Sequence, residues 1–284
     1  GFQPCNRGSI PLGVTIFSCN LCAGTLRYIP SVFCELGHRV TSPTLFQGVN
    51  MARKPVGTGR KTGSVKVSID ASKRGMPIGL RRYGLGQGGL SDEDMIGPHV
   101  DTLKWLKPEL IRLFVQEYYD VYPERGRFHW TTLDRAIGSI IRTGAKPLLS
   151  LCIKPKALYP VVDQDKVHPA SYDEWETLIE RMVRHYNEEL KLGIEYWEVF
   201  NEPDIGESGG CPGRFTPEDY CTYYEHTVMA IRRAWPKAKV GGPALAGHRS
   251  PLLPALLDHC DRKGVPIDFV SWHYYTDDAE TIVK

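Results

Sequence analysis

From about residue 65 onward the sequence alternates between short apolar runs and longer amphipathic segments, and the units recur about every 30 to 45 residues. This alternation predicts βα units with right-handed crossovers and therefore a parallel sheet. We count about six units, the first built on a strand at residues 82–86. The later predicted strands lie at residues 110–115, 147–153, 194–200, 239–242 and 267–273.

Helical periodicity follows each of the first five predicted strands. The predicted helices lie at residues 98–106, 132–143, 171–187, 217–235 and 252–261. The third has the clearest start signal, because Ser171 is followed three residues later by Glu174, which is a capping-box pattern.

Two architectures contain such units, the (β/α)₈ barrel and the doubly wound sheet. Polar residues follow the predicted strands, and barrels collect their catalytic groups at these strand ends. These residues are Gln116, Glu117, Lys154, Asn201, Glu202 and His273. The glycine-rich run at residues 84–89 lacks the spacing of a dinucleotide-binding fingerprint. We therefore expect an incomplete (β/α)₈ TIM barrel of the α/β class.

The first 60 residues do not share this pattern, because Gly, Pro, Ser and Asn interrupt every short apolar run. We predict an irregular extension at residues 1–60 and a barrel domain at residues 61–284. Cys19 and Cys22 have the spacing of zinc ligands and His38 is near, so a small zinc module is the alternative. No second closely spaced pair completes such a site, and we expect no metal.

The charge balance argues against nucleic acid or an anionic membrane as the main partner. The chain has 35 Lys and Arg against 33 Asp and Glu, a net charge of +2. No run reaches the roughly 20 apolar residues that a membrane span needs. The mildly apolar segment at residues 10–26 is a poor signal peptide, since no basic run precedes it. Compartment and oligomeric state stay open.

The sharpest chemical signal is the Asn-Glu-Pro motif at residues 201–203, directly after a predicted strand. Glycoside hydrolysis needs one carboxyl group that stays protonated near neutral pH, and a partly desolvated strand end raises the pKa of a carboxyl group. We predict that Glu202 is this group and that Asn201 offers an amide donor to a sugar hydroxyl; an ordinary turn is the alternative. Strand alternation predicts that Glu198, Phe200 and Glu202 point in one direction.

With these motifs, the chain from about residue 83 to residue 276 resembles glycoside hydrolase family 39, which includes β-xylosidases and α-L-iduronidases. The segments that carry the resemblance are residues 110–119, 197–204, 241–243 and 269–275. The match is closest to the xylosidase-like branch. The resemblance implies a retaining hydrolase that removes a terminal sugar, most simply β-D-xylose, from an oligosaccharide or glycoside without a metal or organic cofactor.

The resemblance also implies roles for single residues. Glu202 corresponds to the general acid/base, Asn201 to the residue that binds the sugar 2-hydroxyl, and Arg112 to an arginine that supports the nucleophile. His273 corresponds to a sugar contact, and Tyr275 to a tyrosine that hydrogen bonds to the nucleophile.

Four further residues are candidates for substrate contact, and three of them have a structural alternative. Gln116 and Glu117 follow the second strand, and Glu117 is equally an ion-pair residue. Lys154 contacts substrate or lies in a solvated loop. Trp272 stacks on a sugar face or packs between barrel and helices, whereas Trp197 is expected to pack in the core.

The main departure from the family concerns the nucleophile, a second Glu at the end of a seventh strand. The sequence stops at Lys284, soon after the sixth predicted strand. Glu117 does not suit the role, because retaining enzymes need carboxyl groups about 5–5.5 Å apart across the bond. We therefore expect a fragment that is unstable and inactive by itself. The alternatives are a non-catalytic carbohydrate-binding protein, a structural protein, and a glycosidase of other specificity, such as an α-L-iduronidase or arabinofuranosidase.

Overall fold

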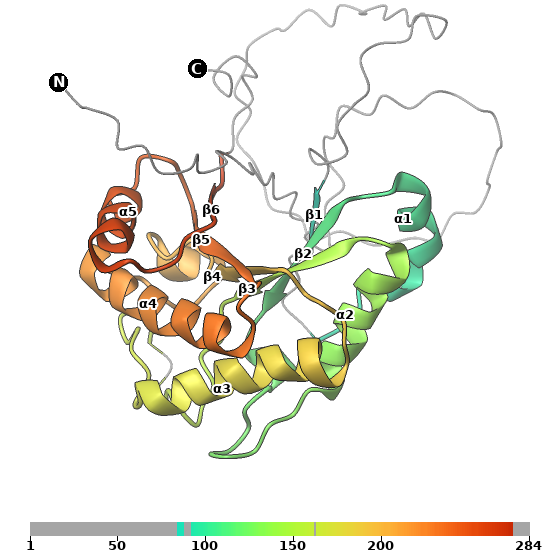
Figure 1. Cartoon of the computed structure of the whole chain (residues 1–284), viewed down its shortest axis with the longest axis horizontal. Coiled ribbons are helices and arrows are strands. Elements are labelled where there is room, and N and C mark those ends of the chain that lie inside the picture. Colours follow the sequence, from blue (N-terminus) through green and yellow to red (C-terminus); the bar gives the residue numbers. More distant parts are fainter. Residues whose placement is uncertain (1–83, 88–91, 162, 275–284) are drawn as a thin grey trace, which may run out of the picture. The chain divides into compact units, whose positions relative to one another are not determined.

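The computed structural model describes residues 84–87, 92–161 and 163–274 (Figure 1). They contain a parallel sheet of six strands in chain order, each paired with the next. The strands are β1 (Gly84–Gln87), β2 (Leu110–Val115), β3 (Lys146–Leu151), β4 (Tyr196–Val199), β5 (Lys239–Leu245) and β6 (Phe269–Trp272).

A helix connects each pair of consecutive strands. These helices are α1 (Val100–Leu106), α2 (Thr131–Thr143), α3 (Tyr172–Arg184), α4 (Pro217–Ala234) and α5 (Leu252–Lys263). A π-helical turn at His185–Glu189 extends α3, and short 3-10 turns lie at Gly97–His99, Glu117–Tyr119 and Gly206–Gly209. No helix in the described ranges is long and apolar enough to cross a bilayer.

The sequential strand order decides between the two expected architectures. Right-handed crossovers that always proceed in the same direction put every helix on one face of the sheet, whereas a doubly wound sheet reverses its strand order. The helices accordingly surround one side of a curved sheet (Figure 1). The fold is an incomplete (β/α)₈ barrel, as expected. The proposed boundary at residue 60 and the zinc alternative at Cys19, Cys22 and His38 lie outside the described residues.

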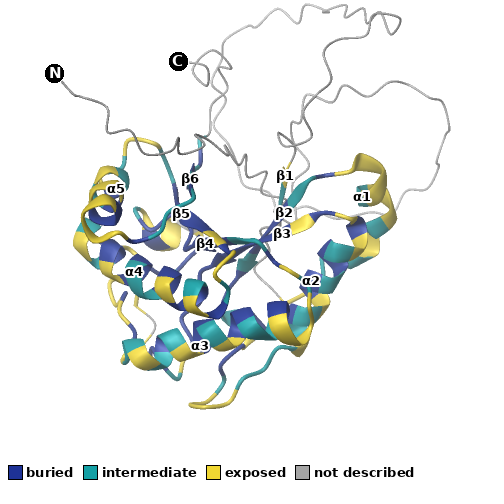
Figure 2. Ribbon diagram, in the orientation of Figure 1, coloured by how far each residue is buried: buried dark blue, intermediate teal, exposed yellow. Residues whose placement is uncertain are grey.

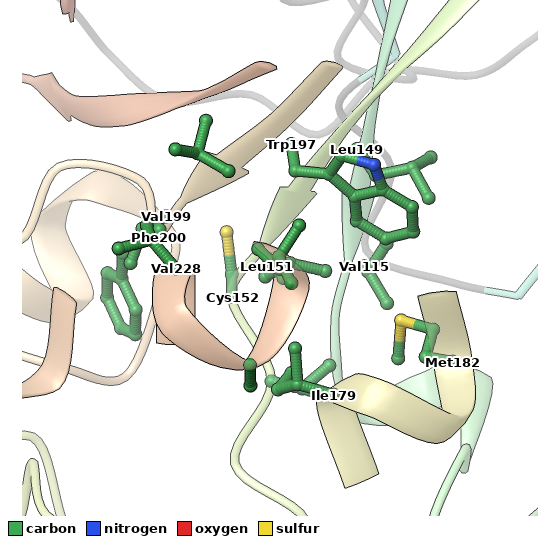
Figure 3. Packing of buried hydrophobic residues seen from close by; sticks show 14 of the residues in the cluster. Val115, Leu149, Leu151, Cys152, Ile179, Met182, Trp197, Val199, Phe200 and Val228 are labelled. Atoms are coloured by element: carbon green, nitrogen blue, oxygen red, sulfur yellow. The ribbon is translucent and has the colours of Figure 1, made fainter. Parts of the chain in front are cut away.

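The main hydrophobic core fills the space between the sheet and its helices. Alternate residues of β2, β3 and β4 point to this side, and they pack against the inner faces of α3 and α4 (Figure 3). The labelled members include Val115, Leu149, Leu151, Trp197, Val199, Ile179, Met182 and Val228. Helices α2 to α5 are buried toward the sheet and exposed on their outer faces, whereas α1 has no buried residue (Figure 2). Trp197 is a core residue, as predicted.

The residues between these positions point to the other side of the sheet, which is the interior of the barrel. Leu148 of β3 and Phe269 of β6 form a second, small apolar cluster there, against which Tyr196 packs. Further along the same strands the interior becomes polar: Ser150 follows Leu148 by two residues, and Ser271 follows Phe269 by two. The site described below is built on this polar layer.

The start of α3 is capped as the sequence predicts, but only by one half of the capping box. Ser171 Oγ accepts a hydrogen bond from the Glu174 backbone N–H at 3.3 Å. The Glu174 carboxylate accepts instead from the Tyr122 hydroxyl at 2.6 Å. The carboxylate thus connects α3 to the segment after β2.

Gly241 of β5 lies opposite Phe269 of β6, and the two backbones approach closely there. A Cβ atom at this position would lie 2.2 Å from the Phe269 carbonyl oxygen, so the two backbones would have to move apart. We expect Gly241→Ala to lower the free energy of unfolding by about 1–3 kcal/mol, the usual cost of overpacking. Urea denaturation followed by circular dichroism measures this change.

Gly138 in the interior of α2 provides the matched control. The nearest atom to a Cβ there is Arg142 Nη1 at 3.8 Å, which is ordinary contact. Gly138→Ala is expected to raise stability by about 0.5–1 kcal/mol, because Ala loses less conformational freedom in a helix. Equal destabilisation by the two substitutions would contradict the importance of the close approach at Gly241.

Candidate active site

The chain leaves the extended conformation directly after β4. Phe200 and Glu202 have φ angles of 73° and 47°, in the left-handed region. The Phe200 ring therefore turns toward the helices, where it contacts Phe215 and Tyr223 at centroid distances of 4.9 and 5.9 Å. The prediction that Glu198, Phe200 and Glu202 share one direction is wrong, because strand alternation requires extended backbone and ends at Val199.

Glu202 is held against the ends of β5 and β6. Its backbone N–H donates to the Ala244 carbonyl at 2.8 Å. Its Oε1 lies 2.6 Å from Nδ1 of His273, which directly follows β6. Only 8% of Glu202 is exposed, and His273 is also buried. The structure thus brings together two residues that the sequence analysis selected separately.

Arg112 of β2 lies in the interior of the barrel, where it binds residues of β3 and β4. Its Nε donates to Glu198 Oε2 at 2.6 Å, and its Nη2 donates to Ser150 Oγ at 3.0 Å. The same Nη2 donates to Asn201 Oδ1 at 2.9 Å. The carboxamide oxygen of Asn201 is therefore directed toward Arg112, and the carboxamide nitrogen, which is the donor, points away from it.

Gln116, which follows β2, binds the loop after Glu202. Its Nε2 donates to the Gly210 carbonyl at 2.9 Å and to Cys211 Sγ at 3.2 Å. Both Gln116 and Cys211 are buried. Gln116 therefore positions the segment that follows Glu202.

Glu117 and Lys154 connect the loops after β2 and β3. Glu117 Oε1 accepts from the Lys154 backbone N–H at 2.6 Å, and burial raises the pKa of Glu117. The Lys154 side chain is 1% exposed and donates from Nζ to the Asp163 carbonyl at 2.9 Å. Burial also lowers the pKa of Lys154. The alternative that Lys154 lies in a solvated loop is therefore wrong.

The remaining candidates are Trp272 and Tyr275. Trp272 is half-buried at the end of β6 and packs against the main core, in agreement with its structural alternative. Tyr275 lies outside the described residues. Among the described residues, no group of three or more His, Cys, Asp or Glu could hold a metal ion.

Glu198 and Ser271 are interior residues that were not selected from the sequence. Glu198 Oε1 accepts from Ser271 Oγ at 2.7 Å, while its Oε2 binds Arg112. The available signal was a single charged residue within the otherwise apolar strand Tyr196–Val199. A buried charge must be paired, so a lone charge in such a strand indicates a partner on another strand of the barrel.

The fold and this arrangement define the class. A parallel barrel that presents a buried carboxyl group, an adjacent amide and a histidine at the carboxyl ends of its strands is the framework of a barrel glycosidase. The model of glycosyl hydrolases family 39 matches residues 97–283. The chain belongs to this family.

The curated relatives agree with this assignment. A β-xylosidase from Caldicellulosiruptor saccharolyticus is 33% identical over 160 residues, which are 53% of this chain and 32% of the relative. A β-xylosidase from Geobacillus stearothermophilus is 31% identical over 164 residues, which are 54% of this chain and 31% of the relative. The chain thus matches about a third of the length of these relatives.

A solved structure shows the same fold. A family 39 β-xylosidase from Caulobacter crescentus superposes with a TM-score of 0.57 at 26% identity. The superposition covers 68% of this chain and 46% of that enzyme. The xylosidase-like resemblance is thereby confirmed at the level of the family.

Proposed function

We propose that the protein is a retaining β-xylosidase in which Glu202 is the general acid/base. One observation carries this proposal: the Glu202 carboxyl group is nearly buried, contacts His273 at 2.6 Å, and directly follows Asn201 at the end of β4. The similarity to two curated β-xylosidases supports xylose as the sugar.

In the proposed reaction Glu202 acts twice. It first protonates the departing glycosidic oxygen, and as a carboxylate it then removes a proton from the water that attacks the covalent glycosyl-enzyme. His273 holds the carboxyl group in place, and the Asn201 amide donates to the sugar hydroxyl next to the reacting carbon. Gln116, Glu117, Lys154, Trp272 and Tyr275 remain proposed contributors to the substrate site.

The proposed nucleophile is a second glutamate at the end of a seventh strand, as the family resemblance implies, and no such strand is among the described residues. Glu198 does not suit this role, because both of its oxygens are occupied by Arg112 and Ser271. The expectation that the 284-residue chain is inactive without this glutamate stays a prediction.

A uronidase is less well supported, since it must bind the carboxylate of its substrate. The two basic candidates among the described residues already have partners: Arg112 binds the Glu198 carboxylate and Lys154 Nζ binds the Asp163 carbonyl. A neutral sugar such as xylose requires no such basic group.

The test is the stereochemistry of hydrolysis. The protein expressed from the whole gene is incubated with 4-nitrophenyl β-xyloside, and proton NMR follows the first product. We expect β-xylose before mutarotation, because two successive displacements retain the configuration. Initial release of α-xylose would contradict the retaining mechanism, and binding of the xyloside without turnover would favour a carbohydrate-binding protein.

A further inference from the structure

Glu198 is a buried carboxylate for which the proposed reaction has no use. It is 0% exposed on β4, and its Oε2 accepts from Arg112 Nε at 2.6 Å and lies 2.5 Å from Arg112 Nη2. Its Oε1 accepts from Ser271 Oγ at 2.7 Å. One carboxylate thus joins β2, β4 and β6 inside the barrel.

Through Arg112, Glu198 is connected to Asn201. The Arg112 Nη2 that contacts Glu198 also donates to Asn201 Oδ1 at 2.9 Å. A guanidinium group is planar and rigid, so the carboxylate that binds it also fixes the direction of its other donors. The orientation of the Asn201 carboxamide therefore depends on Glu198.

Through Ser271, Glu198 is connected to Glu202. Ser271 Oγ accepts from the Ala244 backbone N–H at 3.0 Å, and the Ala244 carbonyl accepts from the Glu202 backbone N–H at 2.8 Å. Ser271 also precedes by two residues His273, whose ring contacts the Glu202 carboxyl group. The two oxygens of Glu198 thus lead to the two residues of the Asn-Glu pair.

We propose that Glu198 is a positioning residue, whose carboxylate orients Asn201 through Arg112 and Glu202 through Ser271. This inference rests on the proposed function. Charged hydrogen bonds in a buried setting are short and directional, which makes them suited to hold side chains within the tolerance that catalysis needs. Glu198 acts on the substrate only through these neighbours.

The experiment compares 4-nitrophenyl β-xyloside with its 2-deoxy analogue in the protein expressed from the whole gene. The ratio of the two kcat/KM values measures the contribution of the sugar 2-hydroxyl. Glu198→Asp keeps the charge but shortens the side chain, and it is expected to lower this ratio roughly ten- to a hundredfold through displacement of Asn201. Asn201→Ala should lower the ratio as well, and the double variant should lower it no further than Asn201→Ala alone.

Two controls separate positioning from general loss of structure. Leu178→Ala removes a fully buried side chain of α3 from the main core between sheet and helices, and Glu195→Gln breaks the exposed ion pair with Lys146 before β4. Both variants should change kcat/KM by the same factor for the two substrates, so that the ratio of the two kcat/KM values stays the same. A crystal structure of Glu198→Asp provides a second readout that does not depend on turnover.

The outcomes are distinct. An unchanged ratio in Glu198→Asp, together with a lowered ratio in Asn201→Ala, would overturn the positioning role while the proposed function stands. An unchanged ratio in Asn201→Ala would instead show that the proposed contact to the 2-hydroxyl is wrong. In that case, or in the absence of turnover, the Glu198→Asp structure decides: a displaced Asn201 carboxamide supports the inference, and an unmoved Asn201 and Glu202 overturn it.

Discussion

Replacement of Glu202 by Gln is expected to lower kcat for xylosides with poor leaving groups by about 10²–10⁴-fold, the usual contribution of a general acid. Gln has the shape of the carboxyl group but has no acidic proton to transfer. Formation of the glycosyl-enzyme from a dinitrophenyl xyloside should be affected much less, since this leaving group departs without protonation. Steady-state and burst kinetics on the protein from the whole gene measure both effects.

Chemical rescue makes this test specific for the acid/base. In Glu202→Ala, azide is expected to attack the accumulated glycosyl-enzyme and release β-xylosyl azide, because a small anion needs no general base. Glu207→Gln, an exposed carboxylate in the loop after Glu202, is the matched control and should retain full activity. If Glu202→Gln lowered kcat equally for good and poor leaving groups, and azide did not restore turnover in Glu202→Ala, Glu202 would not be the general acid/base.

Removal of Arg112 is expected to have the largest effect on stability. Arg112→Met leaves the Glu198 carboxylate buried without its cationic partner, while the Ser271 hydroxyl still donates to it. Breaking a buried ion pair in this way typically costs about 3–5 kcal/mol. Guanidinium chloride denaturation of Arg112→Met at neutral pH measures the loss.

A second substitution tests whether the loss is due to the uncompensated charge. Arg112→Met/Glu198→Gln removes both charges of this buried ion pair, and the Gln carbonyl can still accept from Ser271 Oγ. The double variant should therefore be more stable than Arg112→Met alone, since paired removal of buried charges is often close to neutral. If the double variant were less stable than the single one, packing rather than charge would dominate at this position.

The strand and helix pattern could be predicted closely from the sequence. The second strand was expected at residues 110–115 and is observed at Leu110–Val115, and the helix expected at residues 217–235 is observed at Pro217–Ala234. These elements are determined by local apolar periodicity, which every short segment carries by itself. The strand expected at residues 194–200 is shorter, because the left-handed φ of Phe200 ends it at Val199.

The candidate site could be predicted only in part. Glu202 and His273 were chosen because each follows a strand, and their contact joins residues 71 positions apart. Lys154 was also chosen by position, but its amino group turns to the Asp163 carbonyl. Strand-end location therefore predicts where a side chain begins, whereas its direction depends on neighbouring loops.

By itself the sequence determined that the chain forms parallel βα units and presents an Asn-Glu pair after the fourth strand, since both properties are contained in short segments. Only the tertiary structure decided that Glu198 connects Arg112 to Ser271, through contacts that span 86 and 73 positions. Such contacts depend on the register and curvature of the sheet, because β2, β4 and β6 are not paired with one another and their side chains meet only inside the barrel. No single segment carries that information, because a buried charge finds its partner only after the sheet has formed.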